Sequence, residues 1–147
     1  MSVFAVRGAI EADIPTVKRI ADVCFTDPWG ESTFRSMLSS TVFCVATYDG
    51  EMIGYAVAAV TGDEAELYDI AVLPAYRGTG MASELYDTVA SKVKEGGAVS
   101  FYLEVREGNL RAQAFYAKKG FVKSGMRRNY YDDPKENAIL MSLDLKA

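Results

Sequence analysis

The sequence contains no histidine among its 147 residues and only two cysteines, Cys24 and Cys44. The absence of histidine excludes Cys-His and Ser-His catalytic pairs and every metal site that needs an imidazole. The two cysteines are far apart in the sequence and each lies in an apolar pattern, so we expect buried free thiols and no bound metal. Acid-base chemistry must therefore come from Glu, Asp, Tyr or Lys side chains or from a chain terminus.

Positive charge is also scarce, with 16 basic against 20 acidic residues and a net charge of −4. This balance favours no nucleic-acid partner. No apolar run approaches the ~20 residues needed to span a bilayer. The opening residues place Arg7 in a strand-like pattern instead of a signal-peptide core, so we expect a cytoplasmic protein without a membrane partner. Repeats, low-complexity tracts and linkers are absent as well, which predicts a single domain over residues 1–147.

What the sequence does contain is an alternation of short strand patterns with amphipathic helix patterns. The Asp49-Gly50 pair between two apolar runs is a strong hairpin signal. The order predicts an α/β (α+β) fold in which helices cover a mixed sheet. The expected elements are a strand at 4–6, helices at 13–27 and 32–39, strands at 42–48, 52–60 and 66–72, a helix at 82–93, a strand at 99–105, a helix at 109–119, and strands at 122–131 and 138–145.

The turn at residues 77–82 has the features of a phosphate-binding loop. It follows a strand that stops at Pro74 and it opens a helix, whose free N–H groups and dipole favour an anion. Gly78 and Gly80 allow close backbone approach, and Arg77 adds a charge-assisted partner. A nucleotide P-loop is excluded because no Gly-Lys-Ser/Thr ending follows, and the spacing is a poor match to a Rossmann turn. A turn that only caps a helix remains the alternative.

Several motifs together resemble the GNAT acetyltransferase family. Arg77, Gly80 and Ala82 match the Arg/Gln-x-x-Gly-x-Gly/Ala pyrophosphate loop of that family, and the preceding segment 70–74 is similar to its acetyl-CoA strand. The segments that carry the resemblance further along the chain are 103–109, 114–121, 127–131, 132–134 and 137–141.

The ending 127–141 is similar to the ribosomal-protein-alanine N-acetyltransferase (RimI-like) branch of this family. The resemblance covers nearly the whole chain. It implies a V-shaped, mixed but mostly antiparallel sheet flanked by about four helices, with acetyl-CoA (coenzyme A) held between splayed strands. It also implies acetyl transfer to the N-terminal amine of a protein or peptide, with a ribosomal protein as a candidate acceptor. The alternatives are a GNAT enzyme acting on a small-molecule amine or lysine, and a non-catalytic acyl-CoA-binding module.

The cofactor contacts come from the resemblance. It implies that a backbone N–H of the strand 70–72 stabilises the oxyanion. It also implies that Asn109 contacts the pantetheine side of the cofactor, although Asn109 could equally be only a helix N-cap. The expected cofactor-binding residues are Ile70, Ala71, Val72, Arg77, Gly78, Thr79, Gly80, Met81, Ala82 and Asn109.

An α-amino group, with a pKa of ~7.7 to 8.0, needs a weaker base than a lysine near ~10.4, so a carboxylate acting through water could suffice. Strand alternation points Glu104 away from the apolar face of its strand, and the resemblance puts the base there. The alternative is an ion-paired strand residue, for example with Arg106. Glu66 is the reserve base. Tyr116, which shares a helix face with Asn109, is the candidate general acid, with a half-buried aromatic as its alternative.

The paired aromatics Tyr130 and Tyr131 fall near an expected hairpin tip. By resemblance they form a lip that grips the first residues of the acceptor, and the alternative is cross-strand packing. Trp29, in the loop between the first two helices, lines the opposite side of that slot or packs in the core.

Since neither cysteine has a base beside it, we expect direct attack in a ternary complex and no acyl-enzyme.

Overall fold

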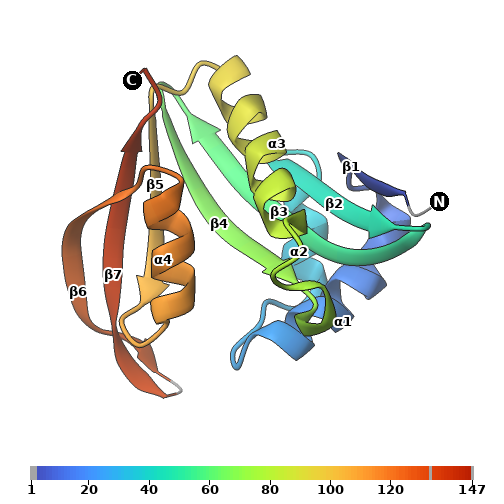
Figure 1. Cartoon of the computed structure of the whole chain (residues 1–147), viewed down its shortest axis with the longest axis horizontal. Helices are drawn as coiled ribbons and strands as arrows, with labels where there is room; N and C mark the ends of the chain where they lie inside the picture. Colours follow the sequence, from blue (N-terminus) through green and yellow to red (C-terminus); the bar gives the residue numbers. More distant parts are fainter. Residues whose placement is uncertain (1–2, 133, 147) are drawn as a thin grey trace.

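The computed structural model describes residues 3–132 and 134–146. Its seven strands form one sheet in the order β1-β2-β3-β4-β5-β7-β6, and every neighbouring pair is antiparallel except β4 and β5, which are parallel. The expected mixed α/β fold is confirmed, with each predicted strand and α-helix in the predicted order (Figure 1). The strands are β1 (Phe4–Gly8), β2 (Val42–Tyr48), β3 (Glu51–Thr61), β4 (Glu64–Val72), β5 (Ser100–Arg106), β6 (Val122–Asp132) and β7 (Lys135–Asp144).

The four α-helices divide between the two faces of the sheet, and each face has its own apolar core. The helices α1 (Ile14–Cys24) and α2 (Glu31–Met37) pack on one face, and α3 (Met81–Glu95) and α4 (Leu110–Lys118) pack on the other. The first helix ends at Cys24, earlier than predicted, and extended backbone at Phe25 begins the loop that contains Pro28. Short 3-10 helices occupy Glu11–Asp13 and Pro74–Tyr76.

Local sequence signals account for several of the element ends. Asp49 and Gly50 have positive φ angles of 51° and 86°, as the predicted two-residue hairpin turn requires. Asn109 is the N-cap of α4, where its side chain accepts a hydrogen bond of 3.1 Å from the Ala112 N–H. Gly120, with φ of 101°, follows α4 in the left-handed conformation that ends many helices.

The feature that positions the site is the separation of the two parallel strands in the centre of the sheet. β4 pairs with β5 only over Glu64 to Glu66, opposite Ser100 to Tyr102. Beyond that point the two strands diverge, which gives the sheet its V shape in Figure 1. The backbone of β4 after Glu66 therefore has an edge that β5 does not pair.

A β-bulge in β4 reverses which side chains face which core. The register with β3 shifts between Val57 and Ala58, opposite the segment that contains Tyr68. Leu67 belongs to the core under α3 and α4, whereas Ala71 belongs to the core under α1 and α2. Without the extra residue, strict alternation would place both on one face.

No helix in the described part of the chain is long and apolar enough to cross a membrane.

Candidate active site

The turn at residues 77–80 presents a cluster of main-chain amides at the start of α3. Gly78 and Gly80 have φ angles of 77° and 87°, and a Cβ atom added at either would meet nothing within 4 Å. Within residues 3–132 and 134–146, the amides from Gly78 to Ser83 have no hydrogen-bond acceptor, and the helix ladder starts with the Glu84 N–H donating to Gly80 O at 3.1 Å. Exposed amides at the positive end of a helix dipole fit a diphosphate.

The side chains of this turn differ in their contacts. The side chains of Met81 and Ala82 are partly buried and pack against the core under α3 and α4. Thr79 Oγ1 donates to the carbonyl of Tyr76 within the turn. Arg77 is exposed, and its Nη2 lies 3.8 Å from Cys24 Sγ.

The free edge of β4 provides a second set of main-chain donors. Antiparallel pairing makes alternate amides face the partner strand. Because Leu73 donates to Ile53 O at 2.8 Å, the amides of Ile70 and Val72 point away from β3, towards the opening between β4 and β5. The Ile70 amide already donates to the carboxylate of Asp69. Val72 is thus the residue of this strand whose amide is best placed for a bound carbonyl oxygen.

The two carboxylates that the sequence singled out line one pocket of about 360 Å³, together with Tyr102 and Arg127. Glu104 is on the face of β5 opposite the buried Leu103, as alternation predicted. The two base candidates, Glu66 and Glu104, therefore lie together in one pocket on the same face of the sheet.

The alternative for Glu104 was an ion-paired strand residue, and among the described residues it does form an ion pair, but not with Arg106. Glu104 Oε1 instead lies 3.4 Å from Arg127 Nε, and Tyr130 donates its hydroxyl to the same carboxylate. Arg106 pairs with Glu136 at 3.2 Å. Arg127 lies on β6, which β7 separates from β5 in the sheet, so this is a contact between segments more than twenty residues apart that no local pattern indicates.

The charge of Glu104 affects the protonation of Glu66. Burial raises the pKa of the Glu66 carboxyl above its usual range, the negative charge of Glu104 raises it further, and Arg127 opposes both effects. Glu66 therefore takes up a proton more readily than an ordinary glutamate.

Tyr116 lies on α4 with 8% of its surface exposed, packed against Phe115 and Phe121. Burial raises the pKa of its phenol well above the usual value, and the nearby charge of Asp69 adds to the effect. The phenol stays protonated at neutral pH and can act only as a hydrogen-bond donor or an acid. Asn109 sits at the N-terminus of the same helix, and its Oδ1 is engaged in the cap described above.

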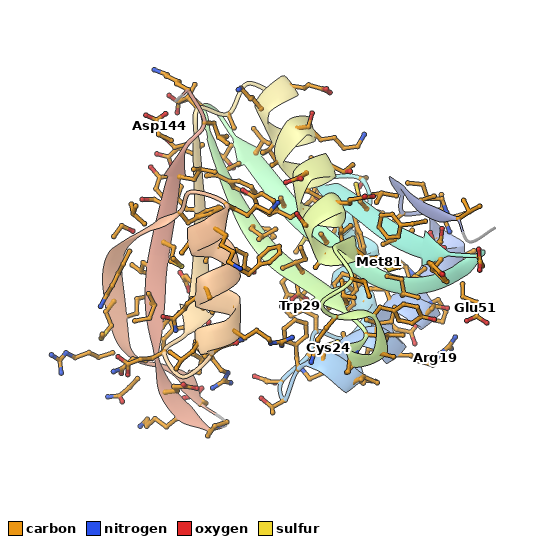
Figure 2. All side chains as sticks on the ribbon, in the orientation of Figure 1. Arg19, Cys24, Trp29, Glu51, Met81 and Asp144 are labelled. Carbon is orange, nitrogen blue, oxygen red and sulfur yellow. The ribbon has the colours of Figure 1, made fainter. Side chains whose placement is uncertain are left out.

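Tyr130 and Tyr131, the pair predicted to form an aromatic lip, lie near the end of β6. Tyr130 and Tyr131 make an edge-to-face contact with 5.1 Å between ring centroids, and the guanidinium of Arg127 lies 5.4 Å from the Tyr130 ring. They belong to the last part of the strand and not to the tip itself, since β6 continues to Asp132. Trp29 lies in the loop before α2 and is half-buried (Figure 2). Its ring contacts the rings of Phe34 on α2 and Tyr68 on β4, which supports a packing role.

The two cysteines are free, as expected, but only Cys44 is buried. Cys24 is half-buried, and its thiol donates to Val72 O at 3.6 Å, beside the opening between β4 and β5. Burial raises the pKa of the Cys24 thiol, which makes it a poor nucleophile. Among the described residues, no group of three or more acidic or cysteine side chains could hold a metal ion.

Asp69 is a residue of the site that sequence reasoning missed. Its Oδ2 accepts a 2.7 Å hydrogen bond from the fully buried Tyr55 hydroxyl. Burial raises the pKa of Asp69 to about 6, against the opposing effects of Tyr55 and of the Ile70 amide. The signal was an acidic residue inside an otherwise apolar strand end, but alternation without the bulge would have put Asp69 on the wrong face.

Replacing Asp69 with asparagine is expected to stabilise the protein, and more so at higher pH. A folded-state pKa above the ordinary value means that native stability is lost as pH rises through about 6, because burial disfavours the charged form. The asparagine variant should therefore gain about 1 kcal/mol more, relative to the parent, near pH 8 than near pH 5. Urea unfolding at both pH values measures this difference. An equal gain in stability at the two pH values would contradict this prediction. Tyr55→Phe removes a hydrogen bond that lowers the pKa of Asp69, so this variant should lose more stability, relative to the parent, near pH 8 than near pH 5.

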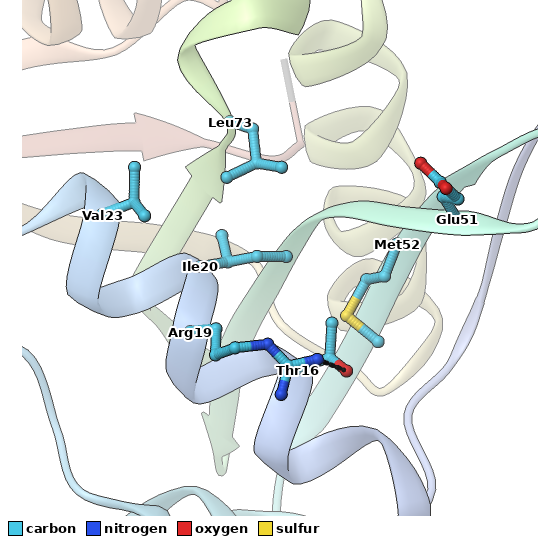
Figure 3. Close-up of a pocket in the computed structure, with 7 residues that line it drawn as sticks. All are labelled: Thr16, Arg19, Ile20, Val23, Glu51, Met52 and Leu73. Atoms are coloured by element: carbon cyan, nitrogen blue, oxygen red, sulfur yellow. Dashed lines mark hydrogen bonds between the residues drawn. The ribbon is translucent and has the colours of Figure 1, made fainter.

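A second depression lies away from these residues. It is lined by Thr16, Arg19, Ile20, Val23, Glu51, Met52 and Leu73, between α1 and the start of β3 (Figure 3). Arg19 Nη2 donates to Thr16 Oγ1 at 3.1 Å along the α1 side of the depression. None of the predicted site residues lines this depression, so it is separate from the carboxylate pocket.

Comparison with known proteins agrees with this geometry. The family model described as Acetyltransferase (GNAT) family matches residues 14–121. The chain is 35% identical over 136 residues to the [ribosomal protein bS18]-alanine N-acetyltransferase of Escherichia coli K12, which covers 90% of this chain and 92% of that protein. The crystal structure of the Escherichia coli ribosomal-protein-S18-alanine N-acetyltransferase superposes with a TM-score of 0.90 at 32% identity, covering 97% and 94% of the two chains.

The structure of Ard1 from Thermoplasma volcanium is also similar, with a TM-score of 0.89, 32% identity and 97% coverage of both chains. The resemblance seen in the loop at 77–82 and in the late motifs is thus supported by sequence and by fold. Together with the divergent β4 and β5 strands and the amide cluster at the start of α3, these matches show that the chain belongs to the GNAT acetyltransferase family.

Proposed function

We propose that this protein, acting as a single domain over residues 1–147, transfers the acetyl group of acetyl-CoA to the α-amino group of a protein N-terminus in the cytoplasm. The observation that carries the proposal is the pair Glu66 and Glu104 in one pocket, on the face of the sheet opposite α3 and α4. The aromatic lip borders this pocket through the contact of Tyr130 with Glu104. The name of the Escherichia coli relative supports a ribosomal protein that begins with alanine as the acceptor.

The donor is proposed to bind across the amides of residues 78–83 and along the free edge of β4. Acetyl-CoA supplies an activated thioester. The turn amides would hold its diphosphate, and the Val72 N–H would donate to the thioester oxygen as negative charge develops there. Asn109 Nδ2 remains for a pantetheine contact, because only Oδ1 takes part in the helix cap.

Proton transfer is assigned to the carboxylate pair and to Tyr116. Glu104 would accept the proton of the acceptor ammonium, directly or through one water, and Glu66 is the second candidate. The free amine then attacks the thioester carbon, the C–S bond breaks, and the leaving thiolate takes a proton from Tyr116. The second proton, which the nitrogen loses as it becomes an amide, passes through water to the Tyr116 phenolate and restores the phenol. The acceptor amine comes from the carboxylate side and the thioester from the α3 side, so both reactants are present together and no cysteine is acylated.

Acetyl transfer to four peptides tests the proposal. The peptides begin with alanine, carry either a free or a blocked N-terminus, and contain or lack a lysine. Both peptides with a free terminus should be acetylated at similar rates, and neither blocked peptide should react. Acetylation of only the lysine-bearing blocked peptide would overturn the assignment of the acceptor. Release of coenzyme A from none of the peptides, together with binding of acetyl-CoA, would identify a non-catalytic binding module instead.

A further inference from the structure

The Arg106 and Glu136 side chains form a half-buried ion pair directly beyond Glu104 on β5. Arg106 Nη1 lies 3.2 Å from Glu136 Oε1, and each side chain has about a quarter of its surface exposed, 23% and 24%. The same Nη1 donates to the carbonyl of Pro134 at 2.9 Å. The guanidinium lies over the Tyr131 ring, with 4.2 Å between Cζ and the centroid. One arginine thus holds the end of the β6-β7 hairpin against β5.

Glu136 extends this link to the loop that leads into α4. Its second oxygen, Oε2, accepts a 2.6 Å hydrogen bond from the Gly108 N–H. A Cβ atom at Gly108 would lie 2.6 Å from that oxygen, so a larger residue here would push the Glu136 carboxylate aside. Gly108 immediately precedes Asn109, the N-cap of α4. The ion pair therefore joins the end of β5, the hairpin and the N-terminus of the helix that carries Tyr116.

A bulge in β6 completes the arrangement on the hairpin side. The register between β6 and β7 shifts between Arg127 and Tyr131, and Asn129 adopts a positive φ of 52° there. The Asn129 N–H donates to Asn137 Oδ1 at 2.8 Å, which fixes the bulge to β7. Tyr131 remains paired with Glu136 in the ladder. The lip tyrosines owe their position to this bulge and to the arginine above Tyr131.

The contacts run without a break from the ion pair to the proposed base. Arg106 packs on Tyr131, Tyr131 contacts Tyr130 at 5.1 Å, and Tyr130 donates its hydroxyl to Glu104. We propose that Arg106 and Glu136 are positioning residues that fix the tyrosine lip and, through it, the orientation of Glu104 towards the acceptor amine. This assignment rests on the proposed function, because it concerns the acceptor side of the same site.

The test compares Glu136→Ala and Glu136→Gln with the parent in acetyl transfer to the alanine peptide. The alanine variant should lower kcat/KM for the peptide about tenfold or more, because a lip displaced by a fraction of an ångström misplaces both acceptor and base. The KM for acetyl-CoA should change less than about twofold. Glutamine keeps an oxygen for the Gly108 N–H but removes the charge, so its effect should be intermediate. Asp87→Asn is the matched control, because it breaks the 2.9 Å ion pair between Lys119 and α3 on the other side of α4.

A double-mutant cycle with Tyr131→Ala separates positioning from a general structural role. If Glu136 acts through the lip, the double variant should lose no more activity than Tyr131→Ala alone. Additive losses, or a peptide kcat/KM within about twofold of the parent in Glu136→Ala, would overturn the inference. If Glu136→Ala fails to bind acetyl-CoA, the glutamine variant decides by the same criteria. An inactive parent enzyme would instead refute the proposed function.

Discussion

Replacing Glu104 with glutamine is expected to lower kcat about 10²-fold near neutral pH, which is the usual contribution of a positioned general base. Glutamine has nearly the same size and can still accept the hydrogen bond from Tyr130, but it cannot take a proton. The KM for acetyl-CoA should stay unchanged, because Glu104 lies in the pocket with Glu66, which is proposed to receive the acceptor. Steady-state rates with the alanine peptide and a thiol-release assay measure both quantities.

The pH dependence of the Glu104→Gln variant is the sharper part of this prediction. An α-amine has a pKa of about 8, so an increasing fraction loses its proton to water as pH rises and the missing base matters less. The deficit should shrink to about tenfold or less at alkaline pH. Glu64→Gln is the matched control, since Glu64 lines the same pocket without contacting Tyr130 or Arg127. Parent-like rates at every pH would remove Glu104 as the base and would turn attention to Glu66→Gln.

The second large effect is expected from Gly80→Ala, which should raise the KM for acetyl-CoA about tenfold or more while changing the peptide KM little. Gly80 has φ of 87°, a conformation that costs an alanine about 1–2 kcal/mol. A Cβ atom there meets no protein atom and projects into the open space beside the unpaired amides. Both the relaxation of the strained backbone and the added methyl group would disturb the proposed diphosphate site.

Gly50→Ala provides a matched control for the backbone strain. Gly50 has an almost identical φ of 86° in the hairpin between β2 and β3, and a Cβ atom added there would also meet open space. Both variants should lose similar stability in urea unfolding, whereas only Gly80→Ala should lose affinity for acetyl-CoA. Equal KM values for the cofactor in the two variants would contradict the proposed binding role of the turn.

The order of the elements was predictable because each depends on a local pattern. The apolar spacing of Val17, Ile20 and Ala21 predicts a helix face, and all three are buried in α1. The Asp49-Gly50 turn and the Asn109 cap also formed as their short-range chemistry requires. Element ends were less accurate, as with the early stop of α1 at Cys24, because packing and not the next residue decides where a helix stops.

The candidate site was only partly predictable, because it depends on contacts between segments that are far apart in the sequence. Alternation placed Glu104 on the correct face, but its partners Arg127 and Tyr130 come from a distant strand. The bulge at Tyr68 turned Asp69 towards Tyr55, and no periodicity in the sequence marks an inserted residue. The roles of the individual site residues remain predictions that the experiments above address.

The sequence by itself determined the kinds of chemistry that this protein can perform. Without histidine and with few cysteines, its acid-base chemistry was limited to Glu, Asp, Tyr or Lys side chains or a chain terminus, and the glycine-bearing turn before a helix predicted an anion site. Only the tertiary structure decided which of these groups meet. The parting of β4 from β5, the bulge at Tyr68 and the Arg106–Glu136 link are contacts between segments far apart in the chain. Their geometry follows from the packing of the whole sheet, and local propensity has no information about it.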